Sequence, residues 1–253
     1  MTDTIELGAA LSAALARRTG RTPHVVICHL RRAKVDMNRQ VEEATLDHPT
    51  AVCAFDAYHG FIETARQGVE AQFHMGIHLD VHGQSHREKW IEFGYLVRRT
   101  ELKRSKTDVD HHRATSSLRH LATCCGDNGG VSFHELIRGE RSLGGLMEAR
   151  GYRSVPSPAN QHPGDGNYFS GGYTTQRHGS RDGGTIDSVQ VESPRDVRHR
   201  DPGHKDMLSY AGHLADSLLE FFSLNYPNGR RRRNFSYPFL SFLILSILGI
   251  PES

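Results

Sequence analysis

Asp80 and His82 stand two residues apart at the end of an apolar run, in a spacing that could bind a metal ion. Alternate side chains of a strand share a face, so the carboxylate of Asp80 and the imidazole of His82 are expected side by side. A histidine can give a lone pair to a metal, and a neighbouring carboxylate can fix the orientation of its ring. We therefore predict that His82 binds a metal and that Asp80 orients it. The alternative is that both lie on the surface of a chain with 17 histidines.

Glu192, Asn38 and Arg39 could supply the rest of a hydrolytic site. Residues 185–192 alternate as a strand does and end on Glu192. A carboxylate at a strand end can act as the general base that deprotonates metal-held water. Arg39 offers paired donors in the geometry that a substrate carboxylate accepts, and we group Asn38 with it as substrate-binding. Taken singly, each of the three also fits an ordinary polar residue on the surface.

The elements expected around these residues alternate between strand and helix, which predicts right-handed parallel units. In open α/β sheets ligands bind at the carboxyl ends of the strands, where Arg39 and His82 are expected. The predicted fold class is therefore α/β, with three layers and a mostly parallel central sheet. The expected elements are a helix capped by Thr2 or Asp3 and ended by Gly20, strands over 24–30, 76–82, 91–99 and 185–192, and helices over 47–72, 143–149 and 206–222.

Composition limits the range of functions. A chain of 253 residues is long enough for one α/β domain, and two full domains are not expected. Lys and Arg number 31 against 29 Asp and Glu, so no overall field points to nucleic acid as a partner. The four cysteines lack both CxxC spacing and the density of a disulfide-rich secreted domain. With no recognisable secretory signal at the start, we expect a cytoplasmic protein with reduced thiols.

Two further stretches bear on the site. Residues 152–184 are rich in glycine and proline, and the aromatic residues among them favour an ordered loop over the substrate to a disordered linker. His59 stands in the apolar stripe of the helix at 47–72, so we expect it to be a packing residue. His86, four residues after His82, would become a metal ligand if the turn between them folds back.

The last part of the chain changes character. Arg230–Arg233 form a basic run, and residues 235–250 are apolar but interrupted by Pro238. Sixteen residues span about 24 Å as a helix, short of the roughly 30 Å of a bilayer core, so a membrane partner is not expected. We predict one domain over 1–227, able to fold without a basic and then apolar tail over 228–253, which we interpret as a non-native read-through tail. A tail anchor, or weak binding of nucleic acid by the arginines, is the alternative.

From about residue 20 to 225 the succession of segments resembles the N-formylglutamate amidohydrolase family, whose fold is similar to that of the zinc carboxypeptidases. The resemblance implies a zinc-exopeptidase type of α/β fold and hydrolysis of the amide bond of a small N-acyl amino acid such as N-formylglutamate. It also implies zinc bound by His82, Glu192 as general base, and Asn38 and Arg39 on the substrate carboxylate. The segments that carry it are 36–39 (DMNR), 58–63 (YHGFIE), 80–83 (DVHG), 92–95 (EFGY), 169–173 (FSGGY), 177–179 (RHG) and 190–193 (QVES).

The resemblance further implies that the first strand and metal loop are missing. It places two more zinc ligands before the first helix, whereas residues 1–23 contain no histidine or cysteine. A catalytic zinc takes three protein ligands, so we expect weak zinc binding and impaired hydrolysis. The alternatives are a metallocarboxypeptidase that acts on peptides and a catalytically dead homologue that still binds carboxylates. If zinc does bind tightly, the ligands are to be sought among His24, His29, His59, His86 and His178.

Overall fold

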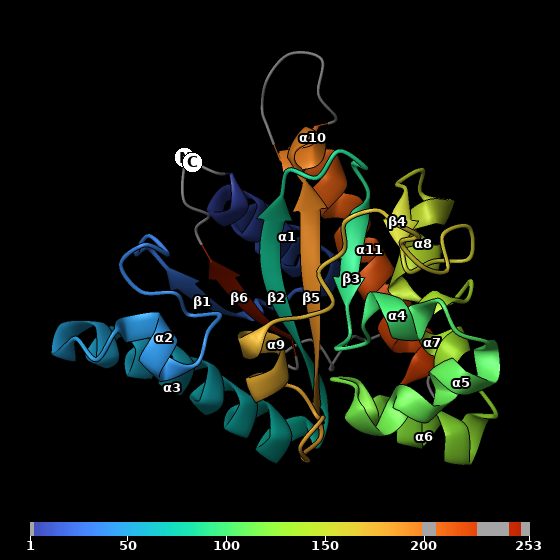
Figure 1. The fold of residues 1–253 in the computed structure, drawn as a ribbon, viewed down its shortest axis with the longest axis horizontal. Coiled ribbons are helices and arrows are strands. Elements are labelled where there is room, and N and C mark those ends of the chain that lie inside the picture. The colour runs from blue at the N-terminus through green and yellow to red at the C-terminus, as the bar shows by residue number, and fades with distance from the viewer. Residues whose placement is uncertain (1–2, 199–205, 227–242, 249–253) are drawn as a thin grey trace.

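A central sheet runs through the protein, with helices on both faces, in a computed structural model that describes residues 3–198, 206–226 and 243–248 (Figure 1). The described strands follow the order β1-β6-β2-β5-β3-β4, and all neighbours are parallel except β3 and β5. This confirms the predicted three-layer α/β fold with a mostly parallel sheet. The strands are β1 His24–Cys28, β2 Gly76–Gln84, β3 Ile91–Gly94, β4 Ser154–Val155, β5 Ile186–Pro194 and β6 Leu243–Leu248.

Helices α1 and α11 pack together on one face of the sheet, and α3 and α9 lie on the other face (Figure 1). These four helices cover the strands that carry the predicted site residues. None of the helices in the described part of the chain is both long and apolar enough to cross a membrane. The helices are α1 Thr4–Thr19, α2 Val41–Thr45, α3 Pro49–Phe73, α4 Arg99–Leu102, α5 Lys106–Asp110, α6 Arg119–Gly129, α7 Phe133–Arg138, α8 Leu143–Ala149, α9 Tyr173–His178, α10 Arg195–Arg198 and α11 Met207–Asn225, with a 3-10 turn over His111–Thr115.

The two faces of β2 have different chemistry. Leu79 and Val81 are fully buried on the face covered by α1, while His78, Asp80 and His82 alternate with them and face α9. The expected alternation of Asp80 and His82 onto one face is therefore present. Because both faces of β2 are buried, the apolar face packs against α1, and the polar side chains of the other face need hydrogen-bond partners inside the protein.

The apolar run near the C-terminus contributes a central strand, which differs from the expected domain boundary at residue 227. β6 lies between β1 and β2 and pairs with both, so its backbone groups complete two ladders. Leu245 and Ile247 are fully buried, and a Cβ placed on Gly8 of α1 would lie 2.1 Å from Cδ1 of Ile247. A continuous apolar run is typical of a strand buried in a parallel sheet. Arg230–Arg233 and Pro238 lie outside the described residues.

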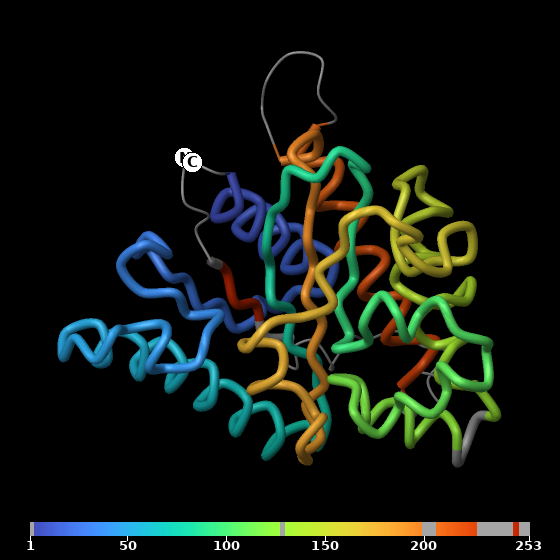
Figure 2. The backbone as a smooth tube through the Cα atoms, in the orientation of Figure 1, coloured from blue at the N-terminus to red at the C-terminus, as the bar shows by residue number. Residues whose placement is uncertain are grey.

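One long loop packs against the sheet at β3. The segment between β4 and α9 passes over β3 and β5, as Figure 2 shows. Tyr168 donates its hydroxyl hydrogen to the carbonyl of Phe93 at 2.9 Å, and a Cβ on Gly94 would lie 2.5 Å from the nitrogen of Gly171. The predicted ordered loop therefore packs directly on β3. The strand expected over 91–99 ends at Gly94, because the chain turns at Leu96, whose φ is 63°.

Candidate functional site

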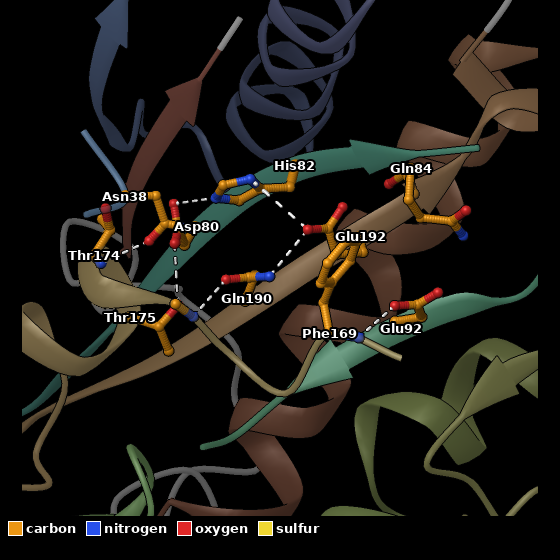
Figure 3. A network of polar contacts seen from close by, with 12 residues as sticks. Asn38, Asp80, His82, Gln84, Glu92, Phe169, Thr174, Thr175, Gln190 and Glu192 are labelled. Atoms are coloured by element: carbon orange, nitrogen blue, oxygen red, sulfur yellow. Dashed lines mark hydrogen bonds and ion pairs between the residues drawn. The ribbon is translucent and has the colours of Figure 1, made fainter. Parts of the chain in front are cut away.

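Asp80, His82 and Glu192 meet where two neighbouring parallel strands pair, from the middle of β2 toward the carboxyl ends of both strands (Figure 3). His82 lies opposite Glu192 in the register of β2 and β5. Its Nε2 is 2.9 Å from Oδ1 of Asp80, and its Nδ1 is 3.8 Å from Oε1 of Glu192. All three side chains are buried. The structure thus brings together three of the five residues predicted from the sequence.

Asp80 accepts two hydrogen bonds and forms one ion pair. Thr175 of α9 donates to Oδ2 at 3.0 Å, Ser246 of β6 donates to Oδ1 at 3.0 Å, and His82 faces Oδ1. Burial alone would raise the pKa of Asp80, but the charge of His82 and these hydrogen bonds bring it below its ordinary value. Asp80 is therefore an ionised carboxylate in the interior.

His82 carries a positive charge in this setting. Burial would lower its pKa, but the carboxylates of Asp80 and Glu192 outweigh burial and raise it to about 9. Nε2 forms an ion pair with ionised Asp80 but lacks the angle of a hydrogen bond to it, and the carboxylate favours a proton on this nitrogen. On loss of the second proton, the lone pair falls on Nδ1, the nitrogen that faces Glu192.

One carboxylate oxygen of Glu192 accepts a hydrogen bond, and the other has no partner among the described residues. Oε1 accepts from Nε2 of Gln190 at 3.0 Å, whereas Oε2 is buried and has no partner among the described residues. Burial and the nearby charge of Asp80 raise the pKa of Glu192, against the lowering effect of His82. A carboxylate with a raised pKa and an unpartnered oxygen takes up a proton more readily than an exposed glutamate.

Glu92 and His86 join the site although the sequence did not single out Glu92. Glu92 lies opposite Glu192 across the antiparallel pair of β3 and β5. It accepts from the backbone nitrogen of Phe169 and from Nδ1 of His86, both at 2.7 Å, and burial raises its pKa to about 7. His86, the alternative ligand, is thus tied to Glu92 and lies against the Phe169 ring, with centroids 4.8 Å apart.

Asn38 and Arg39 occupy different positions. Asn38 accepts a hydrogen bond from the backbone nitrogen of Thr174 at 2.9 Å, so it holds the start of α9, which delivers Thr175 to Asp80. The side chain of Arg39 is 59% exposed, and its Nε lies 3.7 Å from Asp36. Asp36 itself binds Arg32 through two hydrogen bonds. Asn38 therefore acts on the protein backbone, and Arg39 lies outside the buried group.

A second group of histidines lies beneath the site, and we call His59, His78 and His178 the neutral histidine cluster. His59 Nδ1 is 2.9 Å from His178 Nε2, and His78 lies 2.8 Å from a serine hydroxyl at each ring nitrogen. Burial lowers the pKa of His59 and of His78 to about 4, and it lowers that of His178 strongly. His59 is fully buried, in keeping with its place in the apolar stripe of α3.

The described residues fit one ligand of a zinc site but not a complete set. His82 offers Nδ1, with Asp80 behind its ring as a metal-bound histidine commonly has. No group of three or more His, Cys, Asp or Glu side chains suited to a metal occurs among the residues that the structure describes. Among the alternative ligands His24 and His29 are exposed, and His86 is bonded to Glu92.

The geometry is thus a buried imidazole between two carboxylates, a third carboxylate beside them, and an aromatic loop residue at the edge. Such an arrangement can hold and move protons in a place sheltered from water. Comparisons with protein-family models, with curated proteins and with solved structures find no match to this chain.

Proposed function

We propose that this chain hydrolyses the amide bond of a small N-acyl amino acid, with N-formylglutamate as the model substrate. One observation carries the proposal: His82 is fixed by Asp80 through Nε2 and presents Nδ1 to Glu192 at the carboxyl ends of β2 and β5. This is the position in an open α/β sheet where ligands bind. The resemblance to the amidohydrolase family supplies the substrate class.

Glu192 is the proposed base. Its buried Oε2 has no partner among the described residues, so it is available to take the proton of an attacking water. The raised pKa of Glu192 makes it a stronger base than an exposed glutamate. Gln190 keeps the other oxygen in place, which leaves Oε2 as the oxygen that reacts.

Zinc is the proposed cofactor, and His82 Nδ1 is the ligand that the described residues offer it. When bound, zinc lowers the pKa of a water molecule toward neutrality. Asp80 would keep the His82 ring in the orientation that presents Nδ1, as it does in the structure. One ligand binds zinc more weakly than three, so we expect low affinity unless residues outside the described ranges contribute.

Arg39 is the proposed partner of the substrate carboxylate. Its exposed guanidinium makes one long contact with Asp36, which is already engaged by Arg32, so its donors are available to a small acid. Asn38 supports the same edge indirectly, because its side chain anchors the backbone of Thr174. The specificity for an amino acid would thus depend on the loop that precedes α2.

The test is the turnover of zinc-supplemented full chain on N-formylglutamate, N-acetyl amino acids and C-terminal peptides. Glu192→Gln should lower kcat by roughly 100-fold or more, because a general base contributes about 10²–10⁴. The matched control is Glu140→Gln, which changes an exposed glutamate and should leave kcat unchanged. Turnover that survives Glu192→Gln would place the base elsewhere.

The residues that the structure describes do not include a complete set of zinc ligands, which favours one alternative, a homologue that binds carboxylates without hydrolysing them. Binding of N-acyl amino acids without turnover, even with zinc present, would support that alternative. Release of a C-terminal residue from peptides, with N-acyl amino acids inert, would instead indicate a metallocarboxypeptidase.

A further inference from the structure

Ser246 of β6 lies at the centre of the polar face beneath the site. It is fully buried and pairs with Asp80 in the register of β6 and β2. Its hydroxyl oxygen is 3.0 Å from Oδ1 of Asp80 and 2.8 Å from Nε2 of His78. A single hydroxyl thus connects the histidine cluster to the carboxylate that orients His82.

The direction of each hydrogen bond follows from the chemistry of the groups. Ionised Asp80 only accepts, so the hydroxyl hydrogen of Ser246 points to Asp80. The oxygen of Ser246 must then accept the Nε2 hydrogen of neutral His78, which leaves Nδ1 of His78 to accept from Ser188. The hydrogen bonds from Ser188 through His78 and Ser246 therefore all donate in the direction of Asp80.

We propose that Ser246 is a positioning residue for His82. With Thr175 on the other oxygen, Ser246 fixes the carboxylate of Asp80 in the rotation that forms the ion pair with Nε2 of His82. That contact leaves Nδ1 of His82 facing Glu192. The reaction in which this geometry is used rests on the proposed function, whereas the positioning itself does not.

The physical reason is that a buried carboxylate is stable only when hydrogen-bond donors surround it. A buried carboxylate that loses a hydrogen-bond donor pays the desolvation cost of the oxygen that it exposes to apolar surroundings. Asp80 would then turn toward other donors or admit water, and the His82 ring would lose its fixed partner. Partners of a metal-binding histidine of this kind typically change metal affinity or activity by about 10–100-fold when they are removed.

Ser246→Ala in the full chain tests the proposal, and Ser188→Ala is the matched control. Both serines are fully buried and both bond His78, but only Ser246 reaches Asp80. The decisive readout is the downfield proton resonance of the His82 Nε2 hydrogen in the metal-free protein, assigned by its loss in His82→Gln. We expect this resonance to broaden or disappear in Ser246→Ala and in Thr175→Ala, and to persist in Ser188→Ala.

The kinetic constants provide a second readout, which distinguishes a positioning role of Ser246 from a role in stability alone. If the parent chain hydrolyses N-formylglutamate, Ser246→Ala should lower kcat by about tenfold with KM little changed. If the parent is inactive, the proposed function fails while the resonance still decides on Ser246. Should the alanine variant not fold, Ser246→Cys keeps the branching of the side chain, at a slightly larger volume, and weakens the donor. An undisturbed resonance in the Ser246 variant, or equal loss in Ser188→Ala, would overturn the proposal.

Discussion

His78 and His82 lie four residues apart on the same face of β2, and both are buried, yet their pKa values are shifted in opposite directions. Burial lowers the pKa of His78 to about 4, whereas carboxylate partners raise that of His82 to about 9. Asp80 stands between them and touches His82 directly, but it reaches His78 only through the hydroxyl of Ser246. Direct contact with a carboxylate, rather than burial, therefore decides which histidine is charged.

His82 and the neutral histidine cluster also differ in the groups that they contact. His82 lies between two carboxylates, with Asp80 at Nε2 and Glu192 at Nδ1. The neutral histidine cluster bonds to hydroxyls, to a carbonyl and to itself, so its members hold strands and helices together. Histidines close together in the fold thus differ in their partners, with carboxylates around His82 and neutral groups around the cluster.

We expect the largest effect from disrupting β6, because this strand pairs with β2, which carries both His78 and His82. Leu245→Asp places an unpaired charge at a fully buried position of β6, and we expect a loss of about 4 kcal/mol or more in the free energy of unfolding. Leu208→Asp, at a leucine that is 61% exposed, is the control. Urea unfolding measures both. Equal stability of the two variants would show that the chain folds without β6, as expected for a domain over 1–227.

A smaller effect separates the two regions by pH. An unfolded histidine titrates near 6.5, but His59 and His78 titrate near 4 in the folded chain. The unfolded state therefore binds more protons between these values, and stability falls as pH drops from 6.5 to 4. Each group can contribute up to about 3 kcal/mol. For His82 the sign is opposite: its contribution is full below 6.5 and is lost as pH rises to about 9.

The measurement is the free energy of unfolding from pH 4 to pH 9 in three proteins. His59→Gln should flatten the fall on the acid side, because it removes one group that must remain neutral in the fold. His82→Gln should flatten the fall on the alkaline side and leave the acid side in place. An acid side unchanged by His59→Gln would contradict the assignment of the neutral histidine cluster.

The smallest effect on stability is expected at the exposed edge of the site. Arg39→Ala should change the free energy of unfolding by less than about 0.5 kcal/mol, because the side chain is 59% exposed. If Arg39 binds the substrate carboxylate, KM should rise by about tenfold, the cost of one charge-assisted hydrogen bond. The control is Arg87→Ala, whose side chain is 86% exposed. Equal KM values in the two variants would remove Arg39 from substrate binding.

Local pattern was enough to predict several elements. The helix over the first residues ends at Gly20 in a left-handed conformation, as its sequence indicates, and α3 follows the apolar stripe that contains His59. The alternation of Asp80 and His82 onto one face required only the period of a strand. These features depend on residues close together in the chain, which is why the sequence reveals them.

The remaining features depend on long-range pairing. The sequence predicts a tail outside the domain over 228–253, because no local signal shows that Leu243–Leu248 form a strand between β1 and β2. The contact of Ser246 with Asp80 depends on that register, and the pairing of Glu92 with Glu192 depends on an antiparallel neighbour in a mostly parallel sheet. Arg39 was expected in the site from its spacing, and the structure gives it an exposed side chain.

The most direct test of the central contrast is a histidine side-chain 15N spectrum of the full, metal-free chain at pH 7, with His78 and His82 assigned by substitution. The account predicts an imidazolium at His82 that loses its proton near pH 9 and a neutral ring at His78 that gains one only near pH 4. Neutral rings at both positions at pH 7, or a shared titration near 6.5, would contradict it.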